Sequence, residues 1–84
     1  MPEITKKPVT IPAATACHVL WATGHGGYPP GDFTGRLLLA WDQADETNAA
    51  RLAAGWPDYA AALDLLQQPD GIKQLLAIAA RQEG

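Results

Sequence analysis

Two histidines and one cysteine are the residues of this 84-residue sequence best suited to bind a metal ion. His18 and His25 lie seven positions apart, and residues seven apart share a face of a continuous helix. Cys17 is adjacent to His18 and points about 100° away from it. Gly24 is expected to end the helix before His25, and Asp32 adds a further ligand only if the intervening loop folds back, whereas a zinc site needs at least three protein ligands. A buried or surface histidine pair is therefore favoured, and no cofactor is expected.

Nucleophilic and acid–base catalysis find little support in the residue pattern. The chain has no serine, and Cys17 and His18 do not face each other because neighbours on a helix point to different sides. Asp42 and Glu46 lie four residues apart with Asp45 between them, and paired carboxylates act in acid–base chemistry where burial shifts their pKa values. Their place at a helix junction indicates an exposed acidic corner instead. The sequence predicts that the protein is not an enzyme.

The segment 24–31, Gly-His-Gly-Gly-Tyr-Pro-Pro-Gly, is the clearest loop in the chain. A phosphate-binding loop directs backbone N–H groups at its ligand and usually continues into a lysine. Here Tyr28 is followed by Pro29 and Pro30, which have no backbone N–H. A flexible or tightly turned connector is the favoured interpretation, and an active-site lid is the alternative.

Three tryptophans in a chain of this length are the strongest indication of a contact surface. Tryptophan buries a large area with few rotatable bonds and frequently anchors protein interfaces. The alternative is a place in the core, which we favour for all three and most of all for Trp41. An exposed indole beside the glycine-rich loop or at the helix corner before Pro57 would mark a docking patch. The candidate contact residues are Trp21, Tyr28, Pro29, Pro30 and Trp56.

Length and charge narrow the function further. Eighty-four residues fit one domain with a thin core, and a domain of that kind often gains stability by pairing with another copy. The formal net charge is −3, and the six Lys and Arg residues are scattered, so binding to nucleic acid is disfavoured. A single cysteine and the lack of an apolar run of about 18 residues predict a cytoplasmic protein with no membrane span.

Local patterns predict the helices that must position these residues. Thr10 is expected to cap a helix over 11–23, which Gly24 ends, and a buried strand over 16–21 is the minority alternative. Further helices are expected over 33–44, 46–54, 57–67 and 72–82, with Asp32, Asp45 and Asp70 as caps and Pro57 in a first turn.

The apolar faces of these helices predict how they pack. Phe33, Leu37, Ala40, Trp41 and Ala44 recur at helical spacing, and Leu38 and Leu39 widen that face, so the helix over 33–44 is expected to be central. In the last helix Ile72, Leu75, Leu76 and Ala79 are expected to face inward. Short connections favour sharply angled neighbours. We expect an all-α fold: a compact orthogonal bundle of four to five short helices over 10–84, with an extended N-terminal arm over 1–9.

From Gly31 onward the chain contains four short motifs: Gly31-x-Phe33-Thr34, Ala44-Asp45-x-x-Asn48-x-x-Arg51-Leu52, Gly55-aromatic-Pro57 and Asp70-Gly71-Ile72. In these motifs the sequence resembles short uncharacterised proteins of actinobacteria and their phages, over about two thirds of the chain. The resemblance implies a phage or actinobacterial origin, and the host cell cytoplasm if the chain is phage-encoded; it brings no catalytic or binding residues. The motifs themselves favour a helix cap followed by a polar face, with a polar binding edge at Asn48 and Arg51 as the alternative.

These observations together predict a small phage-type accessory protein that acts through protein–protein contact. The partner is expected to be a second copy, in a homodimer or higher oligomer, or a host factor. One alternative is a metal- or ligand-binding regulator that uses His18, His25 and the glycine-rich loop. Another is a minor virion or assembly component.

Overall fold

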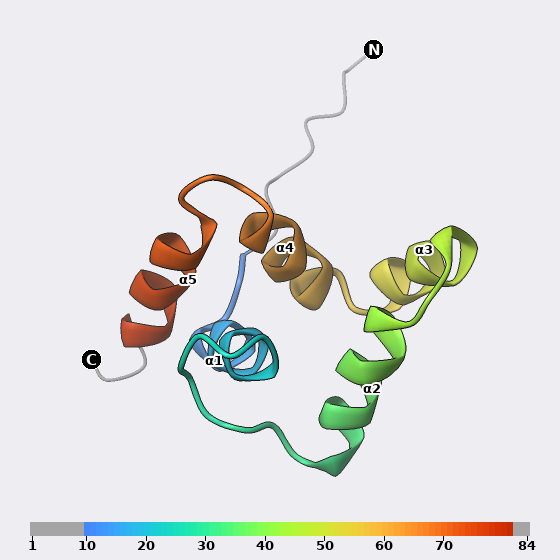
Figure 1. The fold of residues 1–84 in the computed structure, drawn as a ribbon, viewed down its shortest axis with the longest axis horizontal. Helices are drawn as coiled ribbons and strands as arrows, with labels where there is room; N and C mark the ends of the chain where they lie inside the picture. The colour runs from blue at the N-terminus through green and yellow to red at the C-terminus, as the bar shows by residue number, and fades with distance from the viewer. Residues whose placement is uncertain (1–9, 82–84) are drawn as a thin grey trace.

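The computed structural model describes residues 10–81, and within that range the chain forms five α-helices and no strand (Figure 1). The helices are α1 (Ala13–Ala22), α2 (Asp32–Asp42), α3 (Glu46–Gly55), α4 (Pro57–Leu66) and α5 (Gly71–Ala80). The predicted all-α class is therefore confirmed. None of these five helices is both long and apolar enough to cross a bilayer. The predicted arm over 1–9 and the last predicted helical residue, at position 82, lie outside the described residues.

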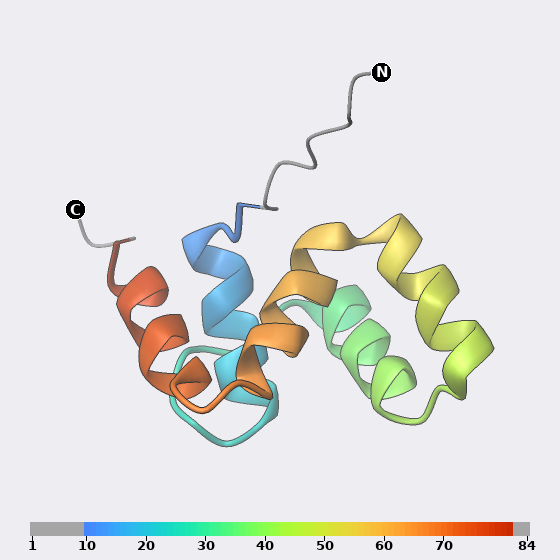
Figure 2. The same cartoon turned by 90° about the horizontal axis from the view of Figure 1, so that it is seen from above.

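Helices α1, α4 and α5 pack against one another and form one half of the molecule, and α2 and α3 form the other half (Figure 2). The two halves meet where α1 contacts α2 and where α3 contacts α4. Among the described helices, α2 and α4 make no direct backbone contact. The central helices are thus α1 and α4.

The core lies between α1, α4 and α5. Leu20 and Leu75 are fully buried there, and burial of a leucine side chain contributes about 1.5–3 kcal/mol each. The buried core residues are Ala16, Val19, Leu20, Leu38, Tyr59, Ala62 and Leu75.

The predicted central position of the second helix is wrong. Leu37 and Leu38 of α2 face inward, but Phe33 is 66% exposed and Leu39 is 58% exposed. Neighbouring residues on a helix are rotated by about 100°, so three leucines in a row cannot all face one side. Helix α2 therefore covers the edge of the core with two leucines and leaves the third in solvent.

The helix starts follow local chemistry, with two corrections to the predicted caps. Pro12, and not Thr10, precedes α1, and its carbonyl accepts the first helical hydrogen bond, from Ala16 N–H at 3.1 Å. Gly31 precedes α2, so Asp32 lies within the first turn, where its charge faces the positive end of the helix dipole. At α3 the predicted cap is confirmed. The carboxylate of Asp45 accepts the backbone N–H of Asn48 at 2.8 Å.

The end of α1 is also as predicted, and it excludes the strand alternative for 16–21. Gly24 has φ +79°, and its N–H donates to Trp21 O at 3.1 Å. The N–H of His25 donates to Leu20 O at 2.8 Å. This pair of bonds is the Schellman arrangement, in which glycine supplies the left-handed residue. It turns the chain sharply back along α1.

The last helix, α5, differs in part from its prediction. Of the four residues predicted to face inward, Ile72 and Leu76 are exposed.

Candidate docking groove

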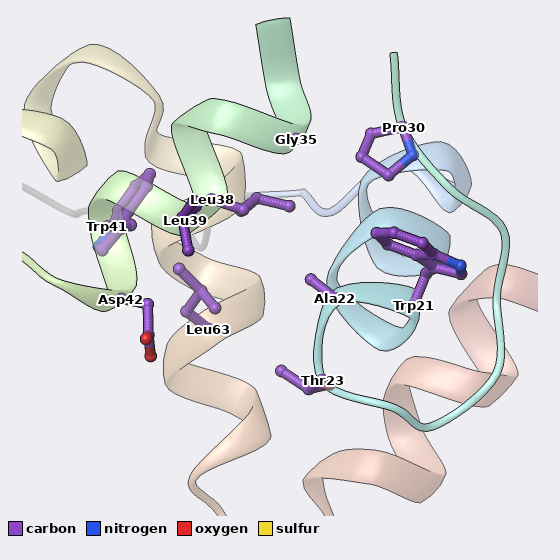
Figure 3. A pocket seen from close by; sticks show the side chains of 10 residues that line it. All are labelled: Trp21, Ala22, Thr23, Pro30, Gly35, Leu38, Leu39, Trp41, Asp42 and Leu63. Carbon is purple, nitrogen blue, oxygen red and sulfur yellow. The ribbon is translucent and has the colours of Figure 1, made fainter. Parts of the chain in front are cut away.

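A hollow of about 610 Å³ opens between α1, α2 and α4 (Figure 3). It is hereafter called the apolar groove. It lies where the backbones of α2 and α4 are apart. Asp42 alone is charged among the described residues that line it. The lining residues are Trp21, Ala22, Thr23, Pro30, Gly35, Leu38, Leu39, Trp41, Asp42 and Leu63.

Large apolar side chains form the walls of the groove. Trp21 and Pro30 stand on one side and Trp41 and Leu63 on the other (Figure 3). Trp21 is 48% exposed, and Leu39 is more exposed still. Trp41 and Leu63 are partly buried and pack against the core, so this wall has a rigid base. The groove thus offers solvent-exposed apolar surface on a well-supported floor, which is typical of an interaction site.

The five predicted contact residues are not all at this site. Trp21 and Pro30 line the groove, whereas Pro29 is exposed outside it. Tyr28 packs edge-on against the ring of His18, with 5.5 Å between ring centroids. Trp56 packs against the core and lies 6.1 Å from the ring of the exposed Phe33. The structure therefore places two of the five in the groove, and the other three do not line it.

The glycine-rich loop holds Pro30 on the same side of the groove as Trp21 (Figure 3). Gly26 and Gly27 have φ of +110° and +69°, values that side chains rarely allow. Gly27 lies directly against the carbonyl oxygen of Cys17, so a Cβ atom at this position would collide with the backbone of α1. The loop is thus a connector that folds back onto α1 at Gly27.

A second cluster, of polar and aromatic side chains, joins α1 to α4. The Nδ1 atom of His18 lies 2.8 Å from the hydroxyl oxygen of Tyr59, and the two rings are stacked with 6.2 Å between centroids. Thr15 donates its hydroxyl hydrogen to Asp58 Oδ2 at 2.8 Å. Burial lowers the pKa of His18, and burial followed by the nearby charge of Asp58 raises the pKa of Tyr59. Both rings are therefore held in their neutral forms near pH 7, which suits the α1–α4 contact that they make.

The two histidines do not share a partner. The Nδ1 atom of His25 lies 2.9 Å from Thr23 Oγ1, on the loop side of α1, whereas His18 pairs with Tyr59 of α4. Cys17 is buried within α1. Within residues 10–81, no three His, Cys, Asp or Glu side chains lie close enough together to hold a metal ion. Among the described residues, His18, His25 and Cys17 therefore do not form a common ligand set.

The acidic corner at the α2–α3 junction is exposed. Asp42, Asp45 and Glu46 all lie in solvent, and Asp45 caps α3. Asn48 and Arg51 line a smaller hollow of about 400 Å³ between α2 and α3. The three carboxylates have separate places, and only Asp42 reaches the apolar groove.

Leu39, Asp42 and Leu63 of the groove were not predicted from the sequence as contact residues. The run Leu37–Leu38–Leu39 carried a signal, because one of three consecutive leucines on a surface helix must be exposed. Nothing in the pattern placed Leu63 beside that leucine (Figure 3).

Comparison with protein-family models, with characterised proteins and with solved structures finds no match for this chain. The role of the groove is therefore inferred from the residues that line it.

Proposed function

We propose that this chain is a small accessory protein that acts through protein–protein contact, and that the apolar groove is its contact surface. The observation that supports this most strongly is the exposure of Trp21 and Leu39 on opposite sides of a hollow with an apolar floor. Removing such side chains from water on docking contributes about 25 cal/mol per Å² of apolar area. An amphipathic helix laid in such a groove is a recurrent mode of protein recognition.

The polar groups that the structure brings together support contact rather than chemistry. His18 pairs with Tyr59, and Thr15 pairs with Asp58, so each hydrogen bond joins α1 to α4. These bonds stabilise the helix pair that carries Trp21 and Leu63. The resemblance to actinobacterial and phage proteins extends the proposal to a phage-type accessory role, in which the contact is with a second copy or with a host factor.

A photo-crosslinker in the groove tests the proposal. We would place p-benzoylphenylalanine at position 39, illuminate cells of the native host, and identify adducts by mass spectrometry. The control carries the same residue at position 47, because Thr47 is exposed on α3 and lines neither hollow. A protein adduct, to another copy or to another chain, is expected at 39 and not at 47. Equal labelling at both positions, or none at 39, would reject the groove as the contact surface.

The volume of the groove also supports a second candidate, a regulator that binds a small apolar ligand there. Ligand sites usually enclose about 300–1,000 Å³, and this hollow falls in that range. Neither His18 nor His25 lines it. A ligand that binds only the folded chain raises its melting temperature, so a thermal-shift screen of apolar compounds, with zinc as a separate arm, checks this candidate. A compound that binds in the groove should raise the melting temperature of the wild type but not that of the Leu39→Asp variant. If no compound behaves in this way, the small-ligand candidate is rejected.

A further inference from the structure

Helix α5 carries apolar residues on the side that faces solvent as well as on the side that faces the core. Leu75 is fully buried, while Ile72 and Leu76 on the outer side are 37% and 45% exposed. Lys73, Ala77 and Ala80 complete the outer face, and all three are exposed. Large apolar side chains that are exposed together on one helix face mark a candidate interaction site. Within the described chain, α5 contacts only α1 and α4.

The outer face of α5 and the apolar groove are both largely apolar, and each carries one charge, of opposite sign. Ile72 and Leu76 lie one turn apart, about 6 Å along the helix axis, which suits two anchors in a single hollow. The segment Gly71–Ala80 has one charged residue, Lys73, which is positive. The described lining of the groove also has one charged residue, Asp42, which is negative. Lys73 follows Ile72 directly and precedes Leu76 by three residues, so all three lie on adjoining parts of one face.

We propose that the groove of one copy binds α5 of a second copy, with Ile72 and Leu76 between Trp21 and Leu39 and with Lys73 beside Asp42. This inference rests on the proposed contact function and names its partner. A pairing of groove with groove is disfavoured because it brings two Asp42 carboxylates together and leaves both α5 faces exposed. The contact is head-to-tail, so a pair of copies retains one free groove, on one copy, and one free α5, on the other. Such contacts generate rings if they close and open chains if they do not.

Complementation between two single-site variants tests the head-to-tail contact. Leu39→Asp disables the groove and leaves α5 intact, whereas Leu76→Asp disables α5 and leaves the groove intact. Both residues are largely exposed, so both variants are expected to fold, which circular dichroism checks. By light scattering after size exclusion, the wild type should grow beyond the monomer mass with concentration, and each variant alone should remain a monomer. Their equimolar mixture should give a dimer and nothing larger, because it holds one working groove and one working α5.

A charge exchange tests the pairing of Lys73 with Asp42. Lys73→Glu alone and Asp42→Lys alone should each weaken association about tenfold or more, as expected for the loss of a close charge pair. The double variant should recover most of the wild-type association, since the two charges are then opposite again. A double variant as weak as the singles would overturn the pairing.

The remaining outcomes separate this inference from the proposed function. A wild-type chain that stays monomeric up to about 1 mM, beyond the range of a useful contact, overturns the head-to-tail proposal. If the crosslinker at position 39 then captures a different protein, the groove is still a contact surface. If the wild type associates but position 39 yields no adduct, the contact uses another surface and both proposals fail. A mixture of the two variants that does not pair rejects the head-to-tail geometry.

Discussion

His18 lies between two tyrosine rings, and its environment predicts how stability depends on pH. Burial lowers its pKa below the unfolded value of 6.5, so the unfolded chain takes up the proton first on acidification. Stability from this group is complete above pH 6.5 and decreases as the pH falls through 6.5 toward the lower folded pKa. We expect the melting temperature of the wild type to drop from pH 8 to pH 5, and that of His18→Gln to drop less. The His25→Gln variant, which leaves the His18 cluster intact, should retain the wild-type drop. An unchanged slope in His18→Gln would contradict this account.

A side chain in the loop would have two energetic costs, backbone strain and steric overlap with α1. Substitutions at Gly24 and Gly27 allow the two to be measured separately. Both have φ in the left-handed region, where a non-glycine residue costs about 1–2 kcal/mol. At Gly24 a Cβ atom meets open space, but at Gly27 it meets the carbonyl of Cys17. Gly24→Ala should therefore lower the free energy of unfolding by about 1 kcal/mol. Gly27→Ala should lower it by at least about 1 kcal/mol more, as for overpacking. Urea denaturation measures both, and equal losses would mean that the close approach has no energetic weight.

At the scale of the helix, Asp45 and Asp70 occupy equivalent positions, directly before the first residues of α3 and α5. Each precedes a helix, yet only the side chain of Asp45 accepts a hydrogen bond, from Asn48 N–H. Asp45→Ala should cost about 1 kcal/mol of stability, the usual value of a lost cap. Asp70→Ala should cost a few tenths, since it removes only an interaction with the helix dipole. Asp45→Asn, which retains an accepting oxygen, serves as the conservative control. A loss at Asp45 no larger than the loss at Asp70 would show that the cap bond does not stabilise α3.

The existence of the five helices could be predicted from local sequence, because their boundaries are set by nearby chemistry. Gly24 ends α1, Asp45 caps α3 and Pro57 opens α4, and each acts within one turn of its own position. The orientation of the helices could not be predicted in the same way. Helix α2 has apolar residues on several sides, and its contact with α1 decides that Leu38 is buried and Phe33 is exposed.

The groove was predictable only in part. Trp21 was a candidate because an indole beside a glycine-rich loop has few neighbours in sequence to cover it. Leu63 and Leu39 come from different helices, and they face one hollow because α2 diverges from α4. That divergence is a property of tertiary packing, which no short motif encodes. The same limit explains why Trp56, an equally plausible candidate, packs against the core.

At the scale of the whole molecule, substitutions at Leu75 and Leu76 separate the stability of the fold from the association of copies. Leu75 is fully buried and Leu76 is 45% exposed. Leu75→Ala should cost about 2–5 kcal/mol, a large fraction of the roughly 5–15 kcal/mol typical of a domain. Leu76→Ala should change the stability of the dilute monomer by less than about 0.5 kcal/mol and weaken association. Thermal denaturation at low concentration measures the first effect, and light scattering at high concentration measures the second. A strong loss of monomer stability in Leu76→Ala would place this residue in the core.

The division of the fold into two halves has a consequence for its internal motion. Helices α2 and α3 are joined to the rest only through α1 and α4 within the described chain, and they bury two leucines and none respectively. Segments with few buried contacts open at lower free energy than the core. In hydrogen–deuterium exchange, the amides of α2 and α3 should therefore exchange earlier than those of α1, and together as one cooperative unit. Because α2 forms one wall of the groove, the same opening would let the width of the groove adjust to α5 of the second copy in the proposed contact.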